Sequence, residues 1–514
     1  LALSLRRFWQ PTRFLLLSWM VIMLLGGILS LDFEAPQSLR AIGTLPVAYL
    51  LAALPIDALW HAWRQTRFGG RFPRLFVWPL LALLIYVGVL NVNKYFVRQA
   101  NDFAVWNAHS TPETIAANFL KNEGDEADFY IISFLTNHPS VNFLARGHGE
   151  IFRLDTTDRF PLRVAADRDV VLIMNAESRS LYEDARRFYP NATFKEIQPD
   201  FGGDVVIYYV RLTPEDIRSL QGLNATYYST PDWSGDPILT RREETIAIDW
   251  ASEQPVAEPF SVEWKGVLNV VRYGPYRLTL RAPAEAELYL NEEMLLSGSG
   301  ELTADLVLAQ GNHAIRLRAV GGVGPLELAW QAPGSATEII PTQAFYVPPV
   351  TNNGLLGNYY ANGEWAEPRA LAQIDPTLNL YFHVPLLPRP YTVEWIGKIH
   401  IAAPGFYRFG LESIDESSLF IDEQLVTEAV VDNQYTEGSI ELGEGLHDIR
   451  VRFGDRTGHT HINLYWTPPG RGQSIVPAAV LFPPQGNYEY IELAAADTIF
   501  AEPPPQSSDI AGVA

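Results

Sequence analysis

The chain has 514 residues, no cysteine and a formal net charge of −21 at pH 7. Its length leaves room for three or four domains, and the lack of cysteine excludes disulfides, thiol catalysis and cysteine-ligated zinc. The acidic balance argues against nucleic acid as a partner, because phosphate backbones are bound by clustered Lys and Arg.

Three segments without a charged side chain lie near the N-terminus, at 14–31, 41–56 and 75–92. Each is close to the ~17–25 residues that cross a bilayer as a helix. A buried helix of a soluble protein is the alternative for any one of them, but three in succession with charged connectors favour a membrane. We predict a membrane region at 1–96, with transmembrane helices at about 14–31, 41–60 and 75–93.

The arginines predict the orientation of these helices. Arg64, Arg67, Arg71 and Arg74 lie in the connector before the third segment, and basic connectors stay in the cytoplasm. We therefore expect a multi-pass protein of the cell membrane, with the lipid bilayer as a partner and everything after the third helix extracytoplasmic. The first residue is Leu and no signal-peptide pattern precedes the first segment, so we expect the chain to be the end of a longer protein.

The next segment, 97–219, alternates between helical and buried-strand patterns. Continuous apolar runs lie at 129–134, 170–174 and 205–210, and a helical pattern covers 181–188. Apolar strands separated by helices are typical of a sheet that is covered on both faces. We predict a small extracytoplasmic α/β domain here.

The last part of the chain is a duplication. The string GLNATYY at 222–228 returns as GLLGNYY at 354–360, and FSVEWKG at 260–266 returns as YTVEWIG at 391–397. A period this long indicates a duplicated domain, since solenoid repeats run at roughly 20–50 residues. We predict two tandem antiparallel β-sandwich domains, at 220–350 and 351–487, followed by a disordered tail at 488–514 that lacks apolar periodicity.

Strand alternation is the same in the two copies. Ile449, Val451 and Phe453 alternate with Asp448, Arg450 and Arg452 in the second copy, as Ile315 and Leu317 alternate with Arg316 and Arg318 in the first. Alternate side chains of a strand point to opposite faces. One face of each sheet is therefore expected to be core and the other solvent-exposed.

The repeated strings resemble the PA14 family. The resemblance rests on the Gly-Leu opening with paired Tyr, the Val-Glu-Trp-x-Gly strand, GPYRLTL or GFYRFGL, a Gly-x-His strand, and a closing Trp with Pro-Gly. It covers about 222–346 and 354–483. Members of that family are β-sandwich modules and several bind carbohydrate, so the resemblance implies a glycan or polysaccharide partner.

Sugar-binding members hold a calcium ion with adjacent aspartates, and this chain departs from that pattern. The first copy has Ala282-Pro283-Ala284 at this place, whereas the second has Ser413-Ile414-Asp415-Glu416. Calcium takes about six to eight oxygen ligands. The resemblance therefore implies a calcium site only in the second copy, at Asp415, Glu416 and Asp422, and the alternative is that both copies are rigid spacers.

Two other groups of side chains have both a functional and a structural interpretation. His459 and His461 lie two residues apart with Asp455 nearby, which is a spacing that a metal site can use. Trp233 and Trp365 recur at one module position, where an exposed ring can stack on a sugar and a buried ring belongs to the core. The strand tryptophans are expected to be core residues: Trp264, Trp330, Trp395 and Trp466.

The segment from Glu34 to Trp60 looks like the last spans of GT-C glycosyltransferases, the family of lipid-phosphate-sugar-dependent protein mannosyltransferases and aminoarabinose transferases. There an outer loop with an Arg leads into a Pro-containing helix, and a small α/β domain follows the final span. The resemblance implies a polyprenyl-phosphate sugar donor, whose phosphate Arg40 would neutralise; an Arg snorkelling at a helix end is the alternative. The family's catalytic carboxylates lie before the region covered, so no residue of this chain is assigned that role.

These expectations combine into one leading hypothesis. The chain is the C-terminal part of a polytopic membrane glycosyltransferase, with the catalytic part absent, and its two PA14-like modules hold glycan at the cell surface. The alternative is a non-enzymatic, membrane-anchored protein for adhesion or polysaccharide binding.

Overall fold

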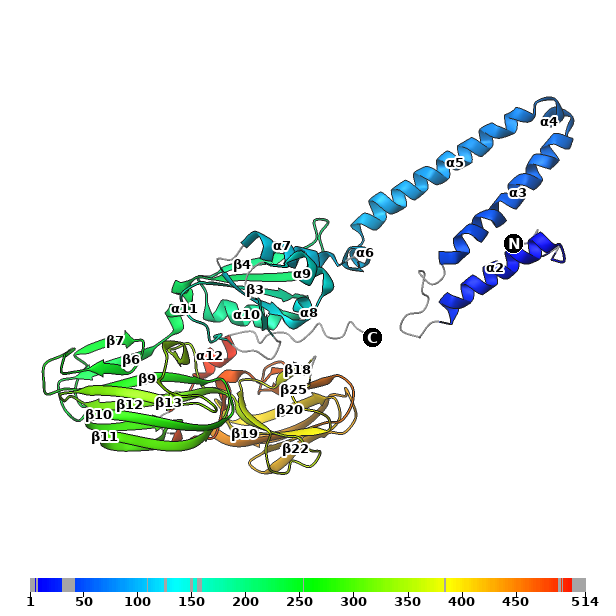
Figure 1. Ribbon diagram of the computed structural model, residues 1–514. Helices are drawn as coiled ribbons and strands as arrows, with labels where there is room; N and C mark the ends of the chain where they lie inside the picture. Colours follow the sequence, from blue (N-terminus) through cyan, green and yellow to red (C-terminus); the bar gives the residue numbers. More distant parts are fainter. Residues whose placement is uncertain are drawn as a thin grey trace. The chain divides into compact units, whose positions relative to one another are not determined.

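The computed structural model describes residues 5, 8–29, 42–108, 110–123, 127–147, 151–154, 160–252, 254–382, 385–488, 491 and 493–501. It contains two compact units, Leu1–Ala108 and His109–Ala514. Each unit is described by itself (Figure 1).

The first unit is helical. Its main helices are α2 (Pro11–Ile28), α3 (Leu45–Gln65) and α5 (Val77–Val92), and α4 (Arg67–Arg71) lies between the last two. Two continuous helical stretches are long and apolar enough to cross a membrane: Ile42–Gln65, with mean hydropathy 1.7, and Pro73–Asn101, with 2.3. Helix α2 contributes a shorter apolar stretch, Pro11–Leu25. The described residues of all three predicted segments are helical almost throughout, but a three-span topology is not confirmed.

The second unit begins with an α/β domain around a mixed sheet of order β2-β1-β3-β5-β4. The strands are β1 (Ala127–Ile132), β2 (Ile151–Leu154), β3 (Asp169–Asn175), β4 (Thr193–Ile197) and β5 (Ile207–Leu212). The helices are α7 (Thr111–Glu123), α8 (Ser133–Thr136), α9 (Pro139–Leu144), α10 (Arg179–Phe188) and α11 (Pro214–Leu220). Strand β3 is buried from Val170 to Met174, which explains its continuous apolar run.

The sequence prediction of this domain needs two corrections. The first predicted strand ends at Ile132, and its last two residues, Ser133 and Phe134, begin helix α8. Strands β2 and β4 were not predicted, because both are short edge strands: β2 has only four residues, and β4 mixes exposed polar side chains with apolar ones.

Module 1 is the first β-rich copy. Its strands are β6 (Leu223–Tyr228), β7 (Leu239–Glu243), β8 (Ala247–Asp249), β9 (Ser261–Val270), β10 (Gly274–Leu290), β11 (Glu293–Leu308), β12 (Gly311–Val320), β13 (Pro325–Gln331), β14 (Thr337–Ile339) and β15 (Phe345–Tyr346). Strand β10 belongs to both layers: Arg277–Arg281 pairs with β13, and Ala286–Leu290 pairs with β12. An irregularity between Ala282 and Ala286 lets the strand pass from one layer to the other.

Module 2, the second copy, has two separate sheets, of order β17-β16-β19-β24-β21-β22 and β18-β25-β20-β23. The strands are β16 (Leu355–Tyr360), β17 (Leu371–Asp375), β18 (Asn379–Phe382), β19 (Tyr391–Ile401), β20 (Gly405–Ser413), β21 (Ser417–Ile421), β22 (Gln424–Ala429), β23 (Thr436–Leu442), β24 (Gly445–Asp455), β25 (Thr460–Thr467), β26 (Ser474–Ile475) and β27 (Leu481–Phe482). Where module 1 has the single strand β10, module 2 has β20 and β21 with a break at 414–416.

Core packing confirms the predicted alternation on the inner face. Ile449, Val451 and Phe453 are buried in module 2, and the four strand tryptophans are at most 3% exposed. The outer face is less solvent-exposed than the alternation predicted. Arg316 is only 5% exposed, because it lies 3.9 Å from the Tyr289 ring centroid and pairs with Glu292. Alternation shows which face a side chain is on, but not what covers that face.

A buried carboxylate in each module binds a tyrosine and a tryptophan. Asp375 accepts hydrogen bonds from the Tyr359 hydroxyl at 2.8 Å and the Trp395 indole N–H at 2.7 Å. In module 1, Glu243 accepts the matching bonds from Tyr227 and Trp264, both at 2.6 Å. The copies therefore share a polar core as well as an apolar one.

Main-chain contacts join neighbouring parts of the second unit. The Gln310 N–H donates to the Ala372 carbonyl and the Ile374 N–H donates to the Gln310 carbonyl, both at 2.8 Å, which links module 1 to module 2. The α/β domain meets module 1 through a side chain: Gln221 Nε2 donates to the Val164 carbonyl at 2.8 Å.

The C-terminal segment requires a correction. Within the predicted disordered tail at 488–514, residues Ala496–Ala501 form helix α12. Ile499 is 7% exposed and belongs to the hydrophobic core of module 2. One buried side chain in a short helix leaves no periodic pattern in the sequence.

Candidate functional site

The candidate site is one end of module 2, formed by loops at 362–366, 389–390, 413–417 and 455–460; we call it the loop end. Its carboxylates are positioned by the break between β20 and β21. Asp415 has a φ of 53°, so the chain turns sharply there. Ser413 and Ser417, on the two sides of the break, are linked through their hydroxyls at 2.8 Å.

Asp415 is held by the loop that follows β24. Its carboxylate accepts hydrogen bonds from the main-chain N–H groups of Arg456, at 2.7 Å, and Thr457, at 2.9 Å. The Thr457 hydroxyl donates to it as well, at 3.1 Å. The carboxylate therefore ties two loops together.

Glu416 pairs with the Arg456 guanidinium at 2.5 Å. The same guanidinium lies 3.4 Å from the Gly363 carbonyl. Both charged side chains remain accessible, with 41% of Glu416 and 43% of Arg456 exposed. This pair therefore presents both a donor and an acceptor to solvent at the loop end.

Asp455 is fully buried beneath them. Its carboxylate pairs with Arg389 Nε at 2.6 Å and accepts from the Thr460 hydroxyl at 2.5 Å. Arg389 also donates to the Gly458 carbonyl at 2.8 Å. Burial, and then the Asp455 charge, raises the pKa of Tyr391, so that phenol stays protonated. The buried charge is compensated, as a buried carboxylate requires.

Asp422 lies at a different turn and has a different role. It accepts from His447 Nδ1 at 2.6 Å and from the Asp448 main-chain N–H at 2.9 Å. The other ring nitrogen of His447 lies 3.0 Å from the Gly443 carbonyl. In module 1 the same turn uses Asn291, whose amide lies 2.9 Å from His313 Nδ1.

We expect His313 to make module 1 less stable in mild acid. Burial lowers the pKa of His313, so the folded module takes up this proton less readily than the unfolded chain, whose histidine titrates near 6.5. As pH falls below about 6.5, protonation favours the unfolded chain, by up to about 1.4 kcal/mol per pH unit. Urea denaturation at pH 7.5 and 5.5 measures this, and His313→Gln should reduce the difference. An equal difference in the variant would contradict the assignment to His313.

The predicted histidine pair does not form a cluster with Asp455. His459 is exposed in the turn before β25, and His461 lies on β25 with Nδ1 3.2 Å from the His459 carbonyl. Among the described residues, no three His, Asp or Glu side chains form a group that could hold a metal ion. The metal site at His459 and His461 and the calcium site at Asp415, Glu416 and Asp422 stay predictions. Arg40 lies outside the described residues.

The corresponding end of module 1 keeps an exposed carboxylate, Glu285, at the position of Glu416, but has Ala284 in place of Asp415. Gly322 approaches Pro283 and Ala284, and Val323 is 77% exposed. The loop that carries Asp455 and Arg456 in module 2 is Gly321-Gly322 here. The two copies therefore share a scaffold and differ in the chemistry of this end.

The recurring tryptophans have a structural role. Trp233 and Trp365 are half-buried, and each indole N–H donates to a strand carbonyl, at 3.1 and 3.0 Å respectively. A guanidinium stacks over each ring, Arg318 at 5.5 Å from the Trp233 centroid and Arg452 at 5.7 Å from that of Trp365. These arginines occupy ring faces that a stacked sugar would need.

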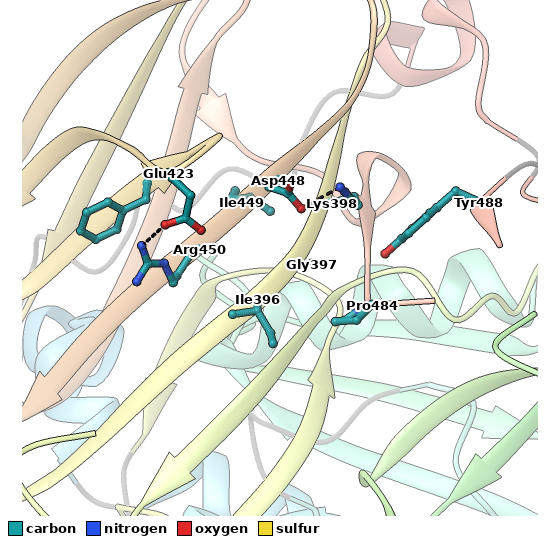
Figure 2. Close-up of a pocket in the computed structure, with 10 residues that line it drawn as sticks. Ile396, Gly397, Lys398, Glu423, Asp448, Ile449, Arg450, Pro484 and Tyr488 are labelled. Carbon is teal, nitrogen blue, oxygen red and sulfur yellow. Dashed lines mark hydrogen bonds and ion pairs between the residues drawn. The ribbon is translucent and has the colours of Figure 1, made fainter. Parts of the chain in front are cut away.

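A shallow pocket of about 180 Å³ lies on the outer face of β19 and β24. Figure 2 shows its charged side chains in pairs, Lys398 with Asp448 and Arg450 with Glu423, while Pro484 and Tyr488 border it. The volume is below the ~300–1,000 Å³ of ordinary ligand pockets. With its charges paired, this pocket is a weaker candidate than the loop end.

The architecture defines a modular protein in which two duplicated β-sandwiches follow apolar helices and an α/β domain. The family model described as PA14 domain matches residues 219–341 and 351–479. The chain therefore carries two PA14 domains, as the resemblance predicted. No curated protein matches the chain.

Several solved structures are similar to parts of this chain. An anti-sigma factor domain-containing protein from Clostridium clariflavum is 22% identical, over 51% of this chain and 100% of that one, with a TM-score of 0.24. A PA14 sugar-binding domain from an RTX adhesin is 16% identical, over 26% and 99%, with a TM-score of 0.23. The Epithelial Adhesin 6 A domain from Candida glabrata, in complex with Galb1-3GlcNAc, is 13% identical, over 28% and 92%, with a TM-score of 0.23. These values are too low to carry an argument about this chain, and the comparisons do not support the GT-C resemblance.

Proposed function

We propose that this protein is anchored in a membrane and displays its PA14 domains outside the cell, where module 2 contacts glycan. The anchor is supported by the stretch Pro73–Asn101, whose apolar window has none of its residues buried within the protein. Leaving such a surface in water is unfavourable, whereas a bilayer accommodates it. The arginine-rich connector at 64–74 favours a cytoplasmic turn, so the chain after Asn101 lies outside.

The loop end of module 2 is the proposed glycan contact, and the observation that carries this proposal is the exposed Glu416–Arg456 pair within a PA14 domain. A carboxylate and a guanidinium side by side offer acceptors and donors to neighbouring sugar hydroxyls. Calcium is not required in this arrangement, because Arg456 already neutralises Glu416 and main-chain N–H groups engage Asp415. The calcium site predicted from the sequence requires Arg456 to move away.

Arg456→Ala should weaken glycan binding about tenfold, as expected for the loss of a charge-assisted hydrogen bond. The measurement is a glycan array with the full chain in nanodiscs, with calcium and with chelator, followed by titration of the best glycan. Val323→Ala, at the equivalent end of module 1, is the matched control and should bind like the parent. Binding that appears only with calcium favours the calcium site, and no binding under either condition overturns the glycan proposal.

A second candidate function rests on the resemblance of the segment from Glu34 to Trp60 alone. In that case the chain continues a glycosyltransferase with a polyprenyl-phosphate sugar donor, and the catalytic carboxylates belong to a segment outside this sequence. Sequencing the coding DNA upstream of Leu1 tests it. Further hydrophobic spans with an acidic outer loop would support the transferase, and a stop signal directly upstream would remove it.

A further inference from the structure

The described part of the α/β domain exposes its large apolar side chains in a single place. Phe143 is 78% exposed and Phe134 is 55% exposed, and Leu144 and Ile151 are 39% and 38% exposed. No other large apolar side chain described between 111 and 220 is exposed to this degree. We call these four residues the apolar patch.

The patch is continuous in the fold. Helix α8, with Phe134, packs against both α9 and β2, which carry the other three residues. Strand β2 is one edge of the sheet, and Figure 1 shows α8 and α9 at the same end of the domain. The opposite edge, β4, exposes the polar side chains Thr193, Lys195 and Glu196. Apolar and polar surfaces therefore lie at opposite edges of one sheet.

Charge around the patch differs from that of the chain as a whole. Arg146 follows α9 and Arg153 lies on β2, and both are exposed, in a protein of formal net charge −21. Exposed aromatic and aliphatic side chains next to arginines match the boundary of an anionic bilayer, where rings enter the interface and guanidinium groups meet lipid phosphates.

A short connection joins the α/β domain to the apolar stretch. Helix α7 begins at Thr111, ten residues after Asn101, where the apolar stretch ends. Ten residues reach at most about 35 Å. We infer that the apolar patch rests in the outer interface of the same bilayer that holds the anchor. This inference depends on the proposed membrane anchoring.

Single-site labelling tests the inference, because the chain has no cysteine. Phe143→Cys in the patch and Thr193→Cys on the opposite edge are each labelled with an environment-sensitive fluorophore. The full chain is placed in nanodiscs of phosphatidylcholine with a minority of phosphatidylglycerol. Nitroxide lipids should quench the label at position 143 at least about threefold more than the label at 193. Equal quenching at the two positions would overturn the inference.

A third label tests the membrane anchor separately from the apolar patch. Val87→Cys lies in α5, within the apolar stretch. Strong quenching at 87 without quenching at 143 overturns the patch alone, whereas no quenching at 87 overturns the anchoring too. The double variant Arg146→Glu/Arg153→Glu should reduce quenching at position 143. High salt should reduce it in the parent protein as well. Quenching at 143 that persists in nanodiscs without nitroxide lipids would instead indicate contact with protein.

Discussion

Asp375→Ala should lower the free energy of unfolding of module 2 by about 3 to 5 kcal/mol. The Asp375 carboxylate is 3% exposed and accepts from Tyr359 and Trp395, both of which are fully buried. Burial, and then the Asp375 charge, raises the pKa of Tyr359, so its phenol stays protonated and donates. Alanine leaves two buried donors without this acceptor, in a position that water does not reach. Urea denaturation of the full chain, with hydrogen exchange to localise the effect, measures the change.

Two variants make this prediction specific. Asp375→Asn keeps an oxygen acceptor and should cost about half as much or less. Asp448→Ala removes an acid of the same module whose side chain is 63% exposed and pairs with Lys398, and it should change stability by less than about 1 kcal/mol. If Asp375→Ala behaves like Asp448→Ala, the carboxylate does not hold the polar core of module 2.

The duplication could be read from the sequence because both copies keep the same physical requirements. Trp264 and Trp395 were expected in the core and are buried there. The buried carboxylate was missed, although a signal was present: Glu243 and Asp375 are both acidic and are separated by the same offset as Tyr227 and Tyr359. An acid that recurs at the repeat offset next to buried aromatic residues indicates a shared hydrogen bond.

The loop end was less predictable from the sequence. Asp415 and Glu416 stood out as carboxylates, but their partner Arg456 is some forty residues further along the chain. The separation of two loops along the sequence does not predict whether they are neighbours in the fold, because their positions depend on the strands that carry them. The same reason applies in part to the apolar patch: α8 and α9 follow each other in the sequence, whereas β2 is brought to them by its pairing with β1.

The proposed function depends on the loops, whereas the fold depends on the repeated strands. A PA14 scaffold is encoded by residues that recur in both copies, whereas the loop ends differ: Gly321-Gly322 in module 1 and Asp455-Arg456 in module 2. After a duplication, both copies can keep the fold while the surface loops of each copy change independently. The end of module 2 has the Glu416–Arg456 pair, whereas the end of module 1 keeps Glu285 but has a glycine at the position of Arg456, so the two ends are expected to have different partners.

The last position of the Val-Glu-Trp-x-Gly motif requires glycine for steric reasons. A Cβ at Gly397 would overlap the Phe482 carbonyl, and at Gly266 it would lie 2.6 Å from the Tyr346 carbonyl. In each module the last strand crosses over this glycine and pairs with the motif strand. The start of the module also binds there: the N–H of Gly354, directly before β16, donates to the Leu481 carbonyl at 2.9 Å. The glycine therefore closes the two ends of the module against each other.

Gly397→Ala should destabilise module 2 by about 3 kcal/mol, because backbone atoms cannot move aside as the end of a flexible side chain can. Hydrogen exchange should rise first at Gly354 and around β27, where the two ends meet. Gly472→Ala is the matched control: a Cβ there has no neighbour within 4 Å, so stability should be unchanged or raised by about 0.5 kcal/mol through the unfolded chain. Equal stability of the two variants would show that the ends of the module are not held together at this glycine.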